Sequence, residues 1–231
     1  MNDGQIRENL ESVRSRIAAS ALRSGRDPAE VRLVAVTKRR PREQVLPLIE
    51  AGQVDLGENF PQELWKMVES FPDPAIRWHL IGHLQSNKAK RTLPLVRMVH
   101  GVDSLKLLHW LDDLASGLND SPLACLQVNT SSEASKHGWF PEALLADAEA
   151  IAACRALPIV GLMTIAGYDT TPEEARPCFV RLRELRDALR ERTGMALNEL
   201  SMGMSNDFEA AIEEGATVVR VGSALFEGID P

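Results

Sequence analysis

The chain has 231 residues, of which 44% are hydrophobic, so it can bury a sizeable core, and we expect a single domain over residues 1–231. The 33 acidic and 26 basic residues give a net charge of −7, and no long basic stripe appears, which excludes nucleic acid as the main partner. Three widely spaced cysteines without a CxxC pair predict reduced thiols and a cytoplasmic protein. The first residues lack the apolar core of a signal peptide, and no stretch approaches the roughly 18 apolar residues of a membrane span, so we expect no membrane partner.

The chain opens with a pattern typical of an amphipathic helix that ends near Gly25. Its apolar residues recur at helical spacing, at Ile6, Leu10, Val13, Ile17 and Ala21. Short apolar runs then predict eight strands, at residues 32–37, 54–56, 77–81, 96–102, 123–128, 159–163, 197–201 and 218–221. Helical stretches separate them, at residues 41–51, 61–70, 85–93, 104–116, 141–153, 172–192 and 207–214. Several of these begin with proline, whose missing N–H costs nothing in the first turn.

The alternation of strands and helices predicts the fold class. We expect an α/β fold, namely a single (β/α)8 TIM barrel with an extra N-terminal helix. An open flavodoxin-like or Rossmann sheet is the alternative. No GxGxxG sequence follows the first strand, however, so the usual dinucleotide signal is missing.

Lys38 directly follows the first predicted strand, and in a barrel of this type the site gathers at the carboxyl ends of the strands. A lysine there is either a solvated loop cation or a nucleophile. Burial would lower the pKa of the ammonium, and a neutral amine can form a Schiff base. Small and polar residues also follow other strands, at residues 57–59, 82–88, 129–136, 163–164, 201–206 and 220–223.

The last two of these segments are typical of a phosphate site. Loops after strands seven and eight of such barrels often bind phosphate through backbone amides. Gly203 and Gly222 would let the backbone approach closely, while Ser205 and Ser223 offer hydroxyls. The alternative is that these residues only form turns and helix caps.

Several other ionisable residues have both a functional and a structural interpretation. Arg220 closes an otherwise apolar strand and should be paired, either with a ligand or in a structural ion pair. His79 and His83 are four residues apart, but no third ligand stands at metal spacing, so we expect no metal. Glu58 and Glu133 could serve as bases or be ordinary solvated carboxylates.

Taken together, these segments resemble the pyridoxal phosphate homeostasis protein family, whose members are relatives of the alanine racemase barrel. The similar segments, in chain order, are LVAVTK, GENFPQE, WHLIGHLQSNK, VDSL, QVNTSSEASKHG, GLMTIAGY, LSMGMSNDFEAAI and VRVGSALF. Each piece alone is weak, but their order and spacing are specific. Arg39, Arg40, Phe60 and Pro61 depart from the family pattern, and none of them removes a group that the binding chemistry needs.

The resemblance implies that Lys38 holds pyridoxal 5'-phosphate covalently as an aldimine. It also implies that Ser205, Gly222 and Ser223 receive the phosphate and that Arg220 faces the pyridine nitrogen. A second group is expected in the pocket or at its rim: Asn59, Asn129, Lys136, Met163, Thr164 and Ser201.

Arg220 also bears on whether the protein catalyses a reaction with the cofactor. Pyridoxal enzymes that make carbanions use a protonated pyridine ring as an electron sink. Arg220 is permanently charged and only donates hydrogen bonds, so it should keep that nitrogen unprotonated and the sink weak. In the related racemases a tyrosine from a second domain of the partner subunit acts on the opposite face of the substrate. Here the only tyrosine is Tyr168 and the chain ends just after the eighth strand, so we expect no racemisation.

The sequence therefore predicts a cytoplasmic, monomeric protein that binds pyridoxal 5'-phosphate and serves intracellular vitamin B6 homeostasis by buffering, storing or delivering it. We expect no enzyme activity, and the expected partners are pyridoxal phosphate and the apo-enzymes that use it. The first alternative is a pyridoxal-phosphate-dependent amino-acid racemase or lyase. The second is an aldolase without cofactor that would use Lys38 directly on a sugar phosphate.

Overall fold

Eight parallel strands close into a barrel in chain order, so that β8 pairs with β1. The structure is a computed structural model and describes residues 3–131, 137–167 and 170–229. The strands are β1 Arg32–Val36, β2 Asp55–Glu58, β3 Arg77–Leu80, β4 Met98–Val102, β5 Leu123–Gln127, β6 Ile159–Met163, β7 Glu199–Ser201 and β8 Val218–Val221. Every predicted strand is present, and the prediction of a (β/α)8 barrel is confirmed.

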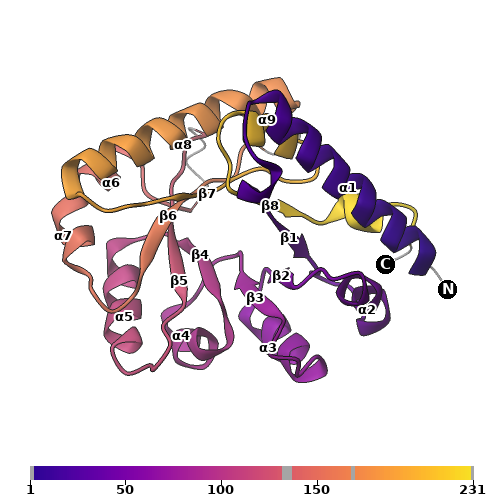
Figure 1. Cartoon of the computed structure of the whole chain (residues 1–231). Helices are drawn as coiled ribbons and strands as arrows, with labels where there is room; N and C mark the ends of the chain where they lie inside the picture. The colour runs from indigo at the N-terminus through magenta and orange to yellow at the C-terminus, as the bar shows by residue number, and fades with distance from the viewer. Residues whose placement is uncertain (1–2, 132–136, 168–169, 230–231) are drawn as a thin grey trace.

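Helices surround the barrel (Figure 1). They are α1 Asp3–Arg23, α2 Arg42–Glu50, α3 Pro61–Ser70, α4 Ser86–Thr92, α5 Leu105–Ala115, α6 Pro141–Ala146, α7 Ala148–Ala153, α8 Pro172–Thr193 and α9 Phe208–Glu213, with short 3-10 helices η1 Pro28–Glu30, η2 Leu93–Leu95 and η3 Ser223–Phe226. The extra helix α1 is confirmed, and it packs against α2, α9 and η3. Among the described residues, no helix is both long and apolar enough to cross a lipid bilayer.

The single helix predicted over residues 141–153 is wrong. The stretch 141–153 forms two helices, α6 and α7, because Asp147 leaves the helical conformation with φ −83° and ψ 3°. Its carboxylate accepts a hydrogen bond of 2.9 Å from Trp139 Nε1. Aspartate is a poor residue for a helix interior, and this contact fixes it at the break.

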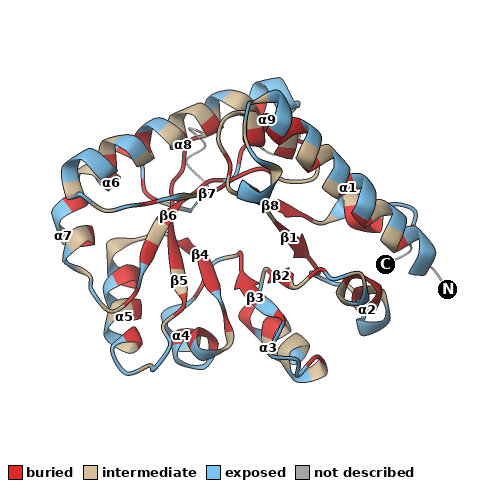
Figure 2. Cartoon of the chain, viewed as in Figure 1, coloured by how far each residue is buried: buried red, intermediate tan, exposed pale blue. Residues whose placement is uncertain are grey.

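Side chains alternate between the two faces of the barrel wall. Leu33 and Ala35 of β1 belong to the main core, which lies between the strands and the helices. Val34 and Val36 alternate with them and form a separate cluster with Ile81 and Val218 inside the barrel. Figure 2 shows the strands as the most consistently buried part of the chain. The wall is thus rigidly packed, and the loops at its carboxyl ends can hold a site.

Candidate binding site at the carboxyl end of the barrel

A cavity of about 370 Å³ opens at the carboxyl ends of the strands. This volume lies within the roughly 300–1,000 Å³ that is typical of small-molecule sites. Of the eleven residues expected in the pocket or at its rim, six line it: Lys38, Asn59, Ser205, Arg220, Gly222 and Ser223. Met163 and Ser201 do not line it. Met163 is buried against Met98 and Cys125, and Ser201 is buried in contact with Arg220.

Lys38 stands at the end of β1 and is exposed. The strand pairing continues one residue past β1, because Thr37 N donates to Gly57 O at 3.0 Å. Arg39 then adopts a left-handed conformation with φ 59°, so the chain turns sharply after the lysine. A non-glycine residue in this region costs on the order of 1 kcal/mol, and such strain is frequent at functional sites. No described residue hydrogen-bonds or ion-pairs with Lys38 Nζ, so the amine is available to a ligand.

Glu58, at the end of β2, is almost fully buried with 1% of its surface exposed. Thr37 Oγ1 donates a hydrogen bond of 2.6 Å to its Oε1, whereas Oε2 is buried and has no hydrogen-bond partner among the described residues. Burial raises the pKa of Glu58 to about 7, against the opposing effects of the Thr37 hydrogen bond and the charge of Lys38. Glu58 is not among the residues that line the cavity; it lies at the end of β2, bonded to Thr37.

The loops that follow β7 and β8 converge on one side of the cavity. Ser205 Oγ accepts hydrogen bonds from Gly222 N at 3.2 Å and from Ala224 N at 3.3 Å, which leaves its own proton to donate. The first loop depends on Gly203, which has φ 94° and whose Cβ would lie 2.9 Å from Phe208 Cα. Backbone and hydroxyl donors from the two loops are therefore gathered at one point.

Asp207 also lines this side of the cavity and is buried. Its Oδ1 accepts a hydrogen bond from Met204 N, so the carboxyl closes the loop after β7. Burial raises the pKa of Asp207, although this hydrogen bond and the charge of Arg220 act in the opposite direction.

Arg220 lines the cavity from within β8 and is 4% exposed. Its Nη1 donates to Ser201 Oγ at 2.7 Å and its Nη2 donates to Thr164 O at 2.9 Å. No described carboxylate lies within ion-pair distance of it, although the charge of the buried Asp207 acts on it from the same cavity, and the guanidinium can still donate to a ligand. Burial lowers the pKa of Arg220 to about 10, so it is still charged at neutral pH.

A chain of buried hydrogen bonds supports Arg220 from inside the barrel. Ser201 Oγ lies 2.7 Å from His100 Nδ1, His100 Nε2 lies 2.9 Å from His79 Nδ1, and His79 Nε2 lies 2.9 Å from Asp55 Oδ1. Burial lowers the pKa of both histidines, so both rings are neutral at pH 7. Burial alone would raise the pKa of Asp55, but hydrogen bonds from His79 and Arg77 outweigh it, and the pKa lies below its usual value.

These charge states determine the order of the protons along the chain. Because the ionised Asp55 can only accept, His79 donates from Nε2 and must accept at Nδ1. His100 then donates from Nε2 and accepts the Ser201 hydroxyl proton at Nδ1. Ser201 Oγ in turn accepts from Arg220. Each hydrogen bond in the chain is thus donated in the direction from Arg220 toward Asp55. Sequence reasoning missed this arrangement because its members lie on five different strands.

Comparison with known proteins decides the family. Residues 2–230 match the family model described as alanine racemase, N-terminal domain. The chain is 45% identical over 227 residues to the pyridoxal phosphate homeostasis protein of Pseudomonas aeruginosa, which covers 97% of this chain and 96% of that protein. This chain belongs to the pyridoxal phosphate homeostasis protein family. The human family member is 39% identical and covers 94% of this chain and 84% of its own length.

Several solved structures have the same fold. PipY of Synechococcus elongatus, 37% identical, covers 96% of this chain and 99% of its own, with a TM-score of 0.87 without PLP and 0.85 with PLP bound. The alanine racemase of Clostridium difficile is only 15% identical, with a TM-score of 0.73 over 96% of this chain and 56% of its own, and shares the fold alone.

The remaining residues singled out from the family resemblance have mixed positions. Asn129 and Thr164 are buried, and Thr164 contributes the backbone oxygen that receives Arg220. Asn59 lines the cavity, as noted above. Lys136, Glu133 and Tyr168 lie outside the described residues.

Proposed function

We propose that this family member binds pyridoxal 5'-phosphate through Lys38 and serves intracellular vitamin B6 homeostasis by buffering, storing or delivering it. One observation carries the proposal. A single cavity of about 370 Å³ holds an exposed lysine amine, a convergent set of backbone and hydroxyl donors, and a buried arginine without a carboxylate partner among the described residues. These groups match the aldehyde, the phosphate and the ring nitrogen of the cofactor.

The residues present fit this ligand in detail. When bound, the cofactor supplies an aldehyde that condenses reversibly with a primary amine, and Lys38 Nζ is the amine at the cavity. Ser205, Gly222 and Ser223 would hold the phosphate. The hydrogen bond from Gly222 N to Ser205 Oγ joins the two loops that carry these residues, and the Ser205 hydroxyl proton remains to donate. Arg220, which lines the same cavity, would donate to the ring nitrogen.

Arg220 also argues for a binding role rather than catalysis. The ordered chain from Asp55 to Ser201 holds the guanidinium as a charged donor, so a ring nitrogen beside it must act as an acceptor. An unprotonated ring is a poor electron sink and stabilises carbanions weakly. Reversible covalent storage needs no electron sink. The name of the relatives and the PLP-bound PipY structure support the same role.

We extend the proposal to a cytoplasmic monomer without enzyme activity of its own, which passes the cofactor to apo-enzymes. The alternative is an amino-acid racemase or lyase. It would exchange the α-proton of an amino acid with solvent deuterium much faster than free cofactor does, and proton NMR of the amino acid distinguishes the two. A cofactor-independent aldolase would instead remain colourless after incubation with pyridoxal phosphate.

The test is reconstitution of the full chain with pyridoxal phosphate, followed by absorbance spectroscopy. We expect a visible band in the wild type that is lost in Lys38→Ala and kept in Lys88→Ala, a control lysine at the same end of the barrel. The loaded wild type should also restore activity to an apo-enzyme that depends on the cofactor. A colourless wild type, or a band that survives Lys38→Ala, would show that the assignment of Lys38 is wrong.

A further inference from the structure

A second cavity of about 510 Å³ adjoins the candidate cofactor cavity. The two share Asn59, Ile81 and Ile165 in their linings. His83 and His137 also line the second cavity, and neither takes part in the proposed cofactor chemistry. Two imidazoles thus lie beside the cofactor cavity without a role in binding the cofactor.

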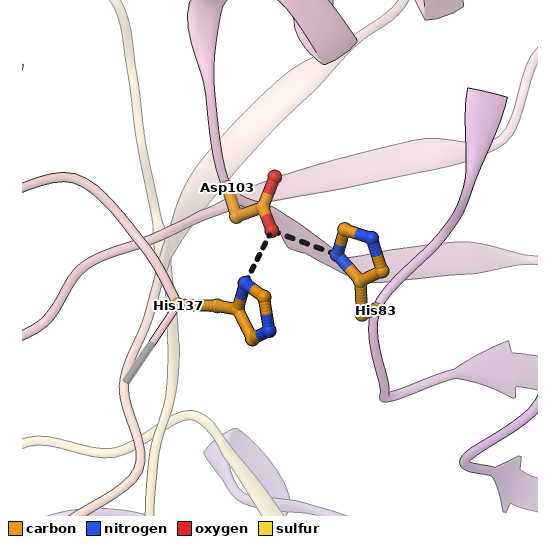
Figure 3. Close-up of side chains that lie close together, drawn as sticks. All are labelled: His83, Asp103 and His137. Carbon is orange, nitrogen blue, oxygen red and sulfur yellow. Dashed lines mark hydrogen bonds and ion pairs between the residues drawn. The ribbon is translucent and has the colours of Figure 1, made fainter. Parts of the chain in front are cut away.

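Three potential metal ligands meet at this place (Figure 3). His83 follows β3, Asp103 follows β4 and His137 follows β5, so three successive strands deliver them to one rim. His83 Nδ1 lies 2.8 Å from Asp103 Oδ2, and His137 Nδ1 lies 3.6 Å from the same oxygen. All three ligand atoms lie within 4.8 Å of one another. The sequence shows no third ligand at metal spacing, because Asp103 and His137 are brought in only by the fold.

Hydrogen bonding explains only part of this arrangement. A distance of 2.8 Å between His83 and Asp103 is a normal hydrogen bond, whereas 3.6 Å between His137 and Asp103 is too long for one. The His137 ring nevertheless turns its Nδ1 toward the carboxylate and stacks on the His83 ring, with centroids 4.9 Å apart and planes 20° apart.

The spacing suits a divalent ion. Zinc binds histidine nitrogen and carboxylate oxygen at about 2.0–2.2 Å, so two ligands of a tetrahedral site are about 3.4 Å apart. The observed separations of 2.8 and 3.6 Å lie on either side of that value. Asp103 is held in place with its side chain 9% exposed, while the imidazoles are 43% and 68% exposed and can rotate to close the geometry.

We propose that His83, Asp103 and His137 bind a divalent transition-metal ion of the zinc class at the rim of the barrel. Two imidazole nitrogens and one carboxylate oxygen form a ligand set that suits such ions, whereas magnesium and calcium prefer oxygen ligands alone. Three protein ligands leave at least one coordination position for water or for an oxygen of a small anion. Both histidines line the second cavity, so that position would face a ligand bound there. The site is independent of cofactor attachment at Lys38.

The test uses the tag-free full chain and cobalt chloride, because tetrahedral Co²⁺ has visible d–d bands that report its ligands. We expect one equivalent of Co²⁺ per chain, displaced by Zn²⁺, and at least tenfold weaker binding in His83→Ala, His137→Ala and Asp103→Asn. His109→Ala is the matched control, because His109 is exposed on α5 and lies outside the cluster, and it should bind like the wild type.

Three results would overturn the proposal. One is a wild type that binds no cobalt at submillimolar concentration. Another is a set of cluster variants that bind as well as the wild type, measured by isothermal titration calorimetry with Zn²⁺. The third is a strong thiolate charge-transfer band, which would place the ion on a cysteine. Circular dichroism spectra verify that the variants are folded, which is expected because both histidines are on the surface.

Discussion

The buried carboxyl of Glu58 makes stability depend on pH in a way that one substitution removes. Its pKa is raised by burial to about 7, whereas an ordinary glutamate has a value of 4.5. Between these two values the folded chain binds a proton that the unfolded chain releases, so stability falls as pH rises through this window. Below about pH 4.5 both states hold the proton, and the penalty is absent.

The size of the effect follows from the two pKa values. A rise from 4.5 to about 7 corresponds to about 3 kcal/mol, at about 1.4 kcal/mol for each tenfold change in proton affinity. Glu58→Gln keeps an acceptor for the 2.6 Å hydrogen bond from Thr37 but cannot ionise. We therefore expect the variant to gain about 3 kcal/mol relative to the wild type as pH rises from about 4.5 to 8.

The assay is urea unfolding of both proteins at a series of pH values, with the difference in unfolding free energy plotted against pH. Any fixed cost of burying the amide shifts the whole curve and leaves its slope unchanged. Glu8→Gln, an exposed carboxylate on α1, is the control and should show no such rise. A difference between Glu58→Gln and wild type that stays constant across this range would refute the argument that Glu58 is buried as a neutral acid.

Two further predictions concern the support of Arg220. Ser201→Ala leaves the buried His100 Nδ1 and Arg220 Nη1 without their partner, so urea unfolding should show a loss of about 2–6 kcal/mol, at about 1–3 kcal/mol for each unsatisfied group. The exposed Ser12→Ala on α1 should change stability by less than about 0.5 kcal/mol, and an equally small change in Ser201→Ala would contradict the hydrogen-bond chain. Arg220→Lys replaces the planar donor group by one ammonium, so equilibrium dialysis should show about 10- to 100-fold weaker cofactor binding, corresponding to about 1.5–3 kcal/mol for a lost charged hydrogen bond. Unchanged affinity would mean that Arg220 does not contact the ligand.

The barrel was predictable from sequence because its signal is local. Apolar runs such as that of β1 and the helical spacing in α1 are visible in short windows, and a parallel barrel brings the ends of all strands to one rim. Lys38, Ser205 and Gly222 all follow strand ends and are therefore expected together, and in the structure they line one cavity.

Contacts between side chains on distant strands were not predictable. His100 and Ser201 are 101 residues apart in sequence, and only the register of the closed barrel brings them within 2.7 Å. The same holds for the meeting of His83 with His137. The exposure of Lys38 and the burial of Glu58 also depend on packing, because the chain direction at Arg39 has no clear sequence signature.

Covalent trapping shows which lysine carries the cofactor. The full chain is loaded with pyridoxal phosphate, reduced with borohydride, digested and mapped by mass spectrometry, with unloaded protein treated in parallel. We expect one reduced cofactor per chain, on the peptide that contains Lys38 and at that residue. Attachment to a different lysine, or no attachment at all, would show that Lys38 does not carry the cofactor.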